Sequence, residues 1–279
     1  MTKTLLAAGA LVALMFGGGA AQVPEVSSPR IYVLDCGTLA INSPEDFGLT
    51  RQEVADTNMP VTCFLVVHPK GTLLFDTGLS DALAGGPFYA GRVGRTTYQM
   101  KYGTLKGQLA ALGVTPENLT YLALSHSHFD HVGNANDYAR ATWLTQKAEY
   151  DVMFGTGPNT RLGPQYNKLG EAKKVVFDGD HDVFGDGTVI LKSTPGHTPG
   201  HQSLYVMLKN TGGVLIAGDL WHYPEERSQD RMPERERRDK TPASRASMEA
   251  FMKANNAQLW IDHAMSFYRD ARKPPQYYD

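Results

Sequence analysis

The residues most capable of chemistry in this sequence lie close together, just after an apolar run that is typical of a buried strand: His126, His128, Asp130 and His131. Because side chains alternate along an extended chain, His126 and His128 can point to one side. Asp130 and His131 break that alternation and can reach a second point nearby. Imidazole nitrogens and carboxylate oxygens are ligands that suit zinc and similar divalent ions. Core packing does not call for so many titratable groups side by side, so the pattern predicts a metal site.

Three more potential ligands follow apolar runs later in the chain. His197 comes after residues 189–192, Asp219 after residues 213–217 and His263 after residues 259–261. Binding groups in α/β proteins collect at the carboxyl ends of strands. We therefore expect these three side chains to join the first cluster.

The elements that must position these residues are strands with helices between them. Apolar and β-branched runs predict strands over residues 31–35, 61–67, 72–75, 121–124, 141–144, 174–177, 189–192, 203–207, 213–217 and 259–261. Helices are expected over residues 105–112, over 147–153, and from Thr241 or Ser244 to about Ala254. A short turn separates the second and third strands, which should form a hairpin. The pattern predicts an α/β class with two sheets.

One residue and two segments between these elements call for separate interpretation. Asp76 ends a strand, and it is either a turn former or a hydrogen-bond partner of a metal-binding histidine. Residues 79–104 combine glycines with aromatic residues, which indicates either a loop over an apolar surface or a surface loop pinned by its own aromatics. Residues 225–240 hold as many acids as bases and are expected to be a solvated linker.

The start of the 279-residue chain resembles a secretory signal. Lys3 precedes the apolar run Leu5–Phe16, and small residues follow up to Ala21. This predicts a signal peptide over residues 1–21 that is too short to stay as a spanning helix. Residues 22–279 show no internal boundary and are expected to form a single domain. The protein is therefore expected to be secreted or periplasmic, without stable membrane anchoring.

Charge and cysteine content limit the partners and the redox state. The formal net charge is −2 at pH 7, which argues against nucleic acid as a partner. The two cysteines, Cys36 and Cys63, lie in predicted strands. They could form one bridge in an oxidising compartment or remain two buried thiols, and the sequence leaves both open. The sequence is also compatible with a homodimer.

With these motifs in order, the chain resembles the metallo-β-lactamase-fold hydrolases, whose HxHxDH signature is matched by residues 126–131. Asp76-Thr77-Gly78, His197, Asp219 and His263 match the remaining motifs of that superfamily in the expected order. The resemblance covers nearly all of the chain after Ile31. It implies an αββα sandwich of two mixed β-sheets flanked by helices.

The resemblance also implies a ligand set for two divalent metal ions. His126, His128 and His197 would hold one ion, Asp130, His131 and His263 the other, and Asp219 would bridge them. Zinc is the expected metal, with iron or cobalt as alternatives. Two such ions can activate a shared water and polarise a carbonyl group.

Within the superfamily, the chain is most similar to the N-acyl-homoserine lactonases. Asp219 matches the bridging carboxylate of lactonases, glyoxalase II and phosphodiesterases, which β-lactamases with this loop generally lack. The few residues after His263 leave no room for the helical domain of glyoxalase II, and RNA phosphodiesterases should be more basic. The expected substrate is an acylated homoserine lactone. A β-lactamase, a broad esterase or thioesterase, and a non-catalytic metal or electron-transfer module are the alternatives.

Three residues are expected to act on the substrate. Asp130 would carry a proton to the leaving ring oxygen. The lactonases have a tyrosine three residues after the bridging Asp, whereas here that position is His222, followed by Tyr223. Either side chain could donate a hydrogen bond to the carbonyl oxygen of the lactone.

Overall fold

The computed structural model describes residues 22–40, 43–86, 89–90, 98–157 and 163–279. The signal expected over residues 1–21 lies outside this range. The larger sheet has the order β4-β5-β1-β2-β3-β6-β7-β8, and the smaller one the order β13-β12-β11-β10-β9. Each sheet is mixed: β3, β6, β7 and β8 are mutually parallel, and β13 runs parallel to β12.

The strands and helices are bounded as follows. The larger sheet consists of β1 (Arg30–Ala40), β2 (Asn58–His68), β3 (Gly71–Phe75), β4 (Tyr89–Ala90), β5 (Tyr98–Met100), β6 (Tyr121–Ala123), β7 (Thr142–Gln146) and β8 (Lys174–Phe177). The smaller sheet consists of β9 (His181–Asp182), β10 (Val189–Ser193), β11 (Gln202–Leu208), β12 (Gly212–Ile216) and β13 (Gln258–Trp260). The helices are α1 (Leu105–Ala111), α2 (Phe129–Val132), α3 (Lys147–Phe154), α4 (Pro224–Ser228), α5 (Thr241–Asn255) and α6 (Met265–Asp270).

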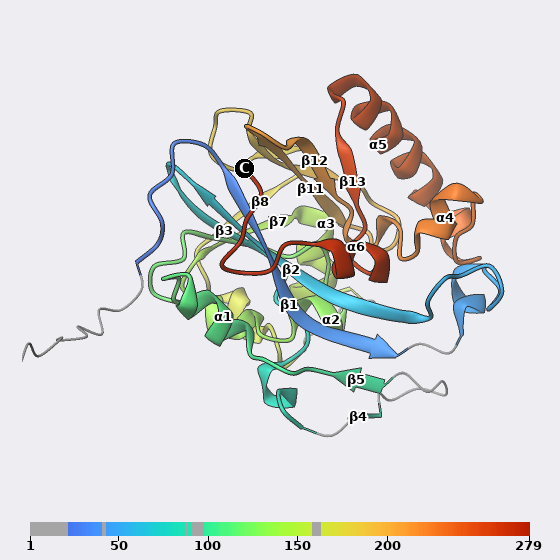
Figure 1. Cartoon of the computed structure of the whole chain (residues 1–279), viewed down its shortest axis with the longest axis horizontal. Coiled ribbons are helices and arrows are strands. Elements are labelled where there is room, and N and C mark those ends of the chain that lie inside the picture. The colour runs from blue at the N-terminus through green and yellow to red at the C-terminus, as the bar shows by residue number, and fades with distance from the viewer. Residues whose placement is uncertain (1–21, 41–42, 87–88, 91–97, 158–162) are drawn as a thin grey trace, which may run out of the picture.

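Alternation along the strands builds three apolar layers. On β1, Ile31 and Val33 point toward the smaller sheet, and Tyr32 and Leu34 point toward α1 and α3 on the other face. A third cluster, which includes Met248 of α5, covers the outer face of the smaller sheet. The order helix, sheet, sheet, helix confirms the predicted αββα sandwich (Figure 1).

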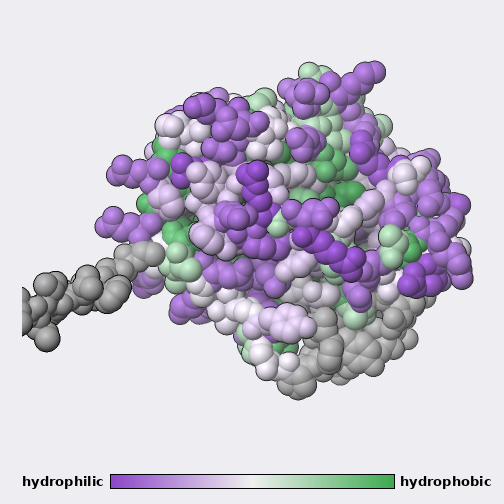
Figure 2. Space-filling model, viewed as in Figure 1, coloured by the Kyte–Doolittle hydropathy of each residue, from purple (hydrophilic) through white to green (hydrophobic). Residues whose placement is uncertain are grey.

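One face of the molecule is largely polar. Figure 2 shows hydrophilic side chains over most of the face in view, with smaller apolar areas between them. No helix in the described ranges is both long enough and apolar enough to cross a membrane.

Two segments differ from what the sequence suggests. Part of the segment 79–104 is regular: β5 extends the larger sheet by pairing with β1, and β4 pairs with β5. The apolar surface expected from residues 87–88 and 91–97 lies outside the described residues. The expected linker, residues 225–240, is folded onto the protein through α4 and a short 3₁₀ helix, Glu236–Arg238. Because acids and bases are equal in number in that stretch, the sequence did not indicate that two of its acids, Glu226 and Glu236, are buried.

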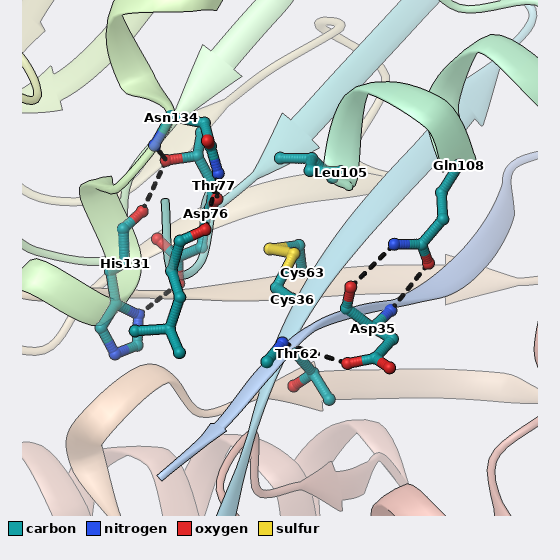
Figure 3. The surroundings of a disulfide bond; sticks show 12 residues. Asp35, Cys36, Thr62, Cys63, Asp76, Thr77, Leu105, Gln108, His131 and Asn134 are labelled. Carbon is teal, nitrogen blue, oxygen red and sulfur yellow. Dashed lines mark hydrogen bonds and ion pairs between the residues drawn. A yellow bond between two sulfur atoms is a disulfide. The ribbon is translucent and has the colours of Figure 1, made fainter. Parts of the chain in front are cut away.

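Cys36 and Cys63 form a disulfide between β1 and β2, which decides between the two alternatives that the sequence leaves open (Figure 3). Cys63 pairs with Leu34 in the sheet, and an irregularity in β1 between Asp35 and Thr38 brings Cys36 beside it. Gly78 packs against this bridge, where a Cβ atom would lie 2.2 Å from the Cβ of Cys36, so only glycine fits. The bridge therefore supports the loop Asp76–Gly78, in which Asp76 contacts the ring of His131.

Replacing both cysteines by alanine should lower the free energy of unfolding by about 3–4 kcal/mol. The bridged residues are 27 positions apart, and the bridge removes the entropy of that loop from the unfolded chain. Denaturant unfolding of the oxidised protein and of the double variant, both metal-loaded, measures the difference. A loss below about 1 kcal/mol would show that the bridge adds little, because large strain or residual structure would then offset the entropy.

Candidate metal centre

The structure gathers all seven expected ligands at the carboxyl ends of strands. His126 and His128 follow β6, and Asp130 and His131 lie in α2 directly after them. The other three lie after β10, β12 and β13: His197, Asp219 and His263. Six of the seven are buried, and His128 is partly buried. Their potential ligand atoms form two groups, each with members within 4.8 Å of one another.

The first group consists of three histidines and Asp219. His128 Nδ1 lies 2.8 Å from His126 Nε2 and 2.9 Å from His197 Nε2. His126 and His128 thus point to one side, as their alternation predicted, and the ring nitrogen of His197 meets them there.

The second group consists of Asp130, His131 and His263. Asp130 Oδ2 lies 3.7 Å from His131 Nε2 and 3.6 Å from His263 Nε2. A second point of convergence therefore exists beside the first.

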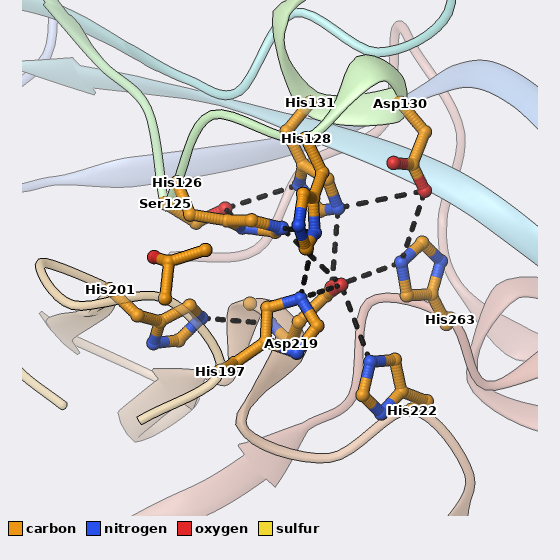
Figure 4. Close-up of polar contacts among 12 residues, drawn as sticks. Ser125, His126, His128, Asp130, His131, His197, His201, Asp219, His222 and His263 are labelled. Carbon is orange, nitrogen blue, oxygen red and sulfur yellow. Dashed lines mark hydrogen bonds and ion pairs between the residues drawn. The ribbon is translucent and has the colours of Figure 1, made fainter. Parts of the chain in front are cut away.

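Asp219 lies between the two groups and offers one oxygen to each (Figure 4). Its Oδ2 lies 3.1 Å from His197 Nε2. Its Oδ1 lies 3.2 Å from His131 Nε2 and 3.0 Å from His263 Nε2. This is the placement expected of a carboxylate shared by two ions.

Burial and charge favour the metal-binding protonation state of His126, His128 and Asp219, whereas Asp219 and Glu236 outweigh burial and raise the pKa of His197. Burial, helped by the neighbouring imidazoles, lowers the pKa of His128 to about 3 and holds the pKa of His126 well below its usual value. Burial by itself would raise the pKa of Asp219, but His131 and His263 outweigh it and keep that pKa well below the ordinary value. Neutral imidazole and ionised carboxylate are the ligand forms of these groups.

In the second group, the charge of neighbouring carboxylates outweighs burial in its effect on the pKa of His131. Burial lowers the pKa of His131, but the carboxylates of Asp219 and Asp76 outweigh this and raise it well above the usual value. His131 therefore holds its proton more tightly than a free imidazole does, and a metal bound at Nε2 would displace that proton.

Two buried atoms test whether these residues fit divalent ions. Among the described residues, His131 Nε2 and Asp219 Oδ1 are buried and lie 3.2 Å apart, but neither makes a well-aligned hydrogen bond. Such atoms are costly to bury unless a cation or proton satisfies them. Together with three ring nitrogens that face one another, they make a set of nitrogen and oxygen donors that fits zinc or a similar ion.

The histidines are held from behind by further contacts. His131 Nδ1 lies 2.8 Å from Asp76 Oδ2, and Asp76 also accepts a hydrogen bond from the Ser125 backbone, so it makes the outer contact that one reading of the sequence expected. His263 Nδ1 donates to the Pro60 carbonyl at 2.8 Å. These contacts leave Nε2 of both rings directed at Asp219, the arrangement common around metal-binding histidines.

Three supporting residues were not expected from the sequence. Glu236 accepts a hydrogen bond from His197 Nδ1 at 2.9 Å, which outweighs the effect of burial and lowers the pKa of Glu236 to about 2. His201 Nε2 accepts a hydrogen bond from the Asp219 backbone at 2.9 Å. Burial lowers the pKa of His201 to about 3, which suits this acceptor role. Its position four residues after His197 is the one signal that could have found it.

Glu149 of α3 is the third of these supporting residues, and it links two ligand-bearing loops. Its Oε1 accepts a hydrogen bond from the Ser127 backbone at 2.8 Å. Its Oε2 accepts from Thr198 Oγ1 at 2.7 Å and from the Gly200 backbone at 3.1 Å. A Cβ atom on Gly200 would lie 2.1 Å from the Glu149 nitrogen, so the loop approaches α3 as closely as only glycine allows.

The two residues expected to contact the substrate point in different directions. The Tyr223 hydroxyl donates to the Thr57 carbonyl at 3.2 Å, and the ring is buried. His222 is also buried, but its Nε2 lies 3.4 Å from Asp219 Oδ2. Glu226 and Asp219 outweigh burial and raise the pKa of His222 to about 10. Of the two, only His222 presents a ring atom to the centre.

Comparison with known proteins gives consistent matches. Residues 56–258 match the model of the metallo-beta-lactamase superfamily. The chain is 28% identical to the N-acyl homoserine lactonase AttM of Azorhizobium caulinodans, over 90% of this chain and 98% of that protein. It is 33% identical to AttM of Rhizobium radiobacter, over 71% of this chain and 80% of that one.

Solved structures show the same fold. A Bacillus thuringiensis AiiA variant with N-decanoyl-L-homoserine bound at its active site superposes with a TM-score of 0.75 at 23% identity, covering 90% of this chain and 100% of that one. AidC, a dizinc quorum-quenching lactonase in complex with its product, gives a TM-score of 0.63 at 17% identity, covering 93% of this chain and 97% of that chain. With the sandwich, the order of the motifs and the family match in agreement, the chain belongs to the metallo-beta-lactamase superfamily.

Proposed function

We propose that this protein is a hydrolase that opens the lactone ring of N-acyl-homoserine lactones with two divalent metal ions. His126, His128 and His197 would hold one ion, Asp130, His131 and His263 the other, and Asp219 both. The observation that carries the proposal is that the two oxygens of Asp219 face different groups of ligands. Similarity to lactonases along nearly the whole chain supports the choice of substrate. We expect zinc, with iron or cobalt as alternatives.

The residues have distinct parts in the proposed reaction. When bound, the two ions would supply an activated water and a polarised lactone carbonyl. Oxygen from the water adds to the carbonyl carbon, and the bond from that carbon to the ring oxygen breaks. Asp130 Oδ2 faces the rings of His131 and His263. Its other oxygen, Oδ1, would take a proton from the water and pass it to the departing ring oxygen. Glu236, Asp76 and Glu149 keep the ligands oriented.

Apolar side chains beside the centre suit an acyl chain. Phe129, between His128 and Asp130 in sequence, is 48% exposed although it is a large apolar residue. Phe47 is partly buried and packs on the His222 ring, with the ring centroids 4.5 Å apart. An acyl chain that covers these rings would remove apolar surface from water, which favours longer chains.

We also propose that the protein is made with a signal peptide over residues 1–21, is exported to the periplasm or beyond, and functions as one domain, residues 22–279. The buried Cys36–Cys63 disulfide supports this, because such bonds persist in oxidising compartments. A homodimer stays a prediction, which the mass of the purified protein in solution tests.

The function is tested with purified, metal-quantified protein and a panel of substrates. We expect turnover of N-acyl-homoserine lactones, with kcat/KM rising from short to long acyl chains, and little turnover of β-lactams or thioesters. Turnover of β-lactams without turnover of any acyl-homoserine lactone would show that the proposal is wrong. The Asp178→Ala variant, altered at an exposed acid after β8, is a matched control for preparation and metal loading.

A further inference from the structure

The imidazole of His222 is held in the same way as the expected metal ligands. Its Nδ1 lies 3.2 Å from Glu226 Oε2, and its Nε2 lies 3.4 Å from Asp219 Oδ2. His197 has the same pattern, with Glu236 at Nδ1 and the same oxygen of Asp219 at Nε2. A buried carboxylate behind one ring nitrogen and an open position before the other is how proteins commonly hold a metal-binding histidine.

The contacts of Glu226 decide which nitrogen of His222 carries the ring proton. Glu226 Oε2 accepts hydrogen bonds from the backbone N–H groups of His222 and Tyr223, and Oε1 faces Arg245 Nη2 at 3.1 Å. With these three donors around it, including a buried arginine, this carboxylate acts as an acceptor. His222 Nδ1 is therefore the donor. With Nδ1 engaged by Glu226, Nε2 is the nitrogen that can offer its lone pair to a metal ion when that ion displaces the Nε2 proton.

His222 Nε2 faces the same oxygen of Asp219 as two histidines of the first group do. Asp219 Oδ2 lies 3.5 Å from His126 Nε2, 3.1 Å from His197 Nε2 and 3.4 Å from His222 Nε2. The His197 and His222 ring centroids are 5.0 Å apart, close to the 4.7 Å between the rings of His126 and His197. A metal ion that replaces the proton between His222 Nε2 and Asp219 Oδ2 would contact both the ring nitrogen and the carboxylate oxygen. Figure 4 shows His222 directed at Asp219 from the side opposite His131.

We propose that His222 is a further ligand of the metal ion expected at His126, His128, His197 and Asp219, and that Glu226 with Arg245 positions it. The inference rests on the proposed two-metal centre and replaces the hydrogen-bond donor role that the sequence suggested for His222. Imidazole suits zinc, iron, cobalt and nickel, so the added ligand is compatible with each expected metal.

The test measures metal binding without substrate. Wild type, His222→Phe, His222→Gln and Glu226→Gln are loaded with Zn²⁺ and titrated with a chelator, and the visible spectrum of each Co²⁺-loaded protein is recorded. His222→Phe should weaken the affinity for one ion by roughly 100-fold or more and change the Co²⁺ spectrum. Glu226→Gln should weaken it by about 10-fold, the lower end for loss of an outer partner. His181→Gln, which removes a histidine on β9, is the matched control and should bind metal as the wild type does.

Failure of the proposed ligand role of His222 can be distinguished from failure of the proposed lactonase function. If His222→Phe and His222→Gln both bind two ions with wild-type affinity and an unchanged Co²⁺ spectrum, the ligand role is wrong, even if turnover falls. His222→Gln keeps a polar side chain, so it remains informative if His222→Phe does not fold. Absence of lactone turnover in wild type would contradict the proposed substrate and leave the metal titration unaffected.

Discussion

Asp219→Ala is expected to lose metal and activity together. Alanine removes the one carboxylate that faces both groups of ligands, at 3.1 Å from His197 Nε2 and 3.0 Å from His263 Nε2. Loss of an outer partner typically costs 10–100-fold in metal affinity, and loss of a shared ligand should cost more than about 100-fold for at least one ion. In the proposed reaction, the activated water depends on that ion. We therefore expect kcat/KM for acyl-homoserine lactones to fall by at least about the same factor.

Elemental analysis and kinetics on one preparation check this result. The metal-to-protein ratio should fall from near two toward one or less, and excess metal should restore little activity. The Asp178→Ala control should keep both the ratio and the rate. If the variant holds two ions at full occupancy, Asp219 does not bridge them, whatever happens to the rate.

The metal-site candidates could be predicted because their chemistry and their spacing are local. His126, His128, Asp130 and His131 are close in sequence, and each later candidate follows an apolar run. The end of a strand fixes where the next side chains lie, so a one-dimensional pattern was enough. The αββα layers followed from the same alternation and from the resemblance to a family.

Apart from Asp76, the groups that orient the ligands could not be found in this way. Glu226 and Glu236 stand in a stretch with as many bases as acids, and nothing local marks these two as the buried ones. These two acids are buried because α4 and the following 3₁₀ helix pack against the loops after β10 and β12. The disulfide was undecided for a similar reason, because the irregularity in β1 that brings Cys36 beside Cys63 is not visible in the sequence.

Glu149→Ala is expected to weaken both the fold and the metal centre, although Glu149 is not an expected ligand. One buried carboxylate accepts from Ser127, which lies between His126 and His128, and from Thr198 and Gly200, which follow His197. Leaving buried donors without a partner costs about 1–3 kcal/mol each, so the loss of stability should reach about 3 kcal/mol or more. Since both loops lose the group that holds them together, metal affinity should fall by about 10–100-fold.

Glu149→Gln separates orientation from simple loss of packing. Glutamine fills nearly the same space but keeps only one acceptor oxygen, and its NH₂ group would face either Ser127 or the pair Thr198 and Gly200. We expect metal affinity between that of wild type and Glu149→Ala, measured by chelator competition, and a smaller loss of stability in denaturant unfolding of the metal-free protein. Asp151→Ala, at an exposed acid on the same helix, should change stability by less than about 0.5 kcal/mol and leave metal binding unchanged. If Glu149→Ala lowers stability but binds metal like the wild type, Glu149 supports only the fold, and the ligand loops are held in register by their own contacts with Asp219, Glu236 and His201.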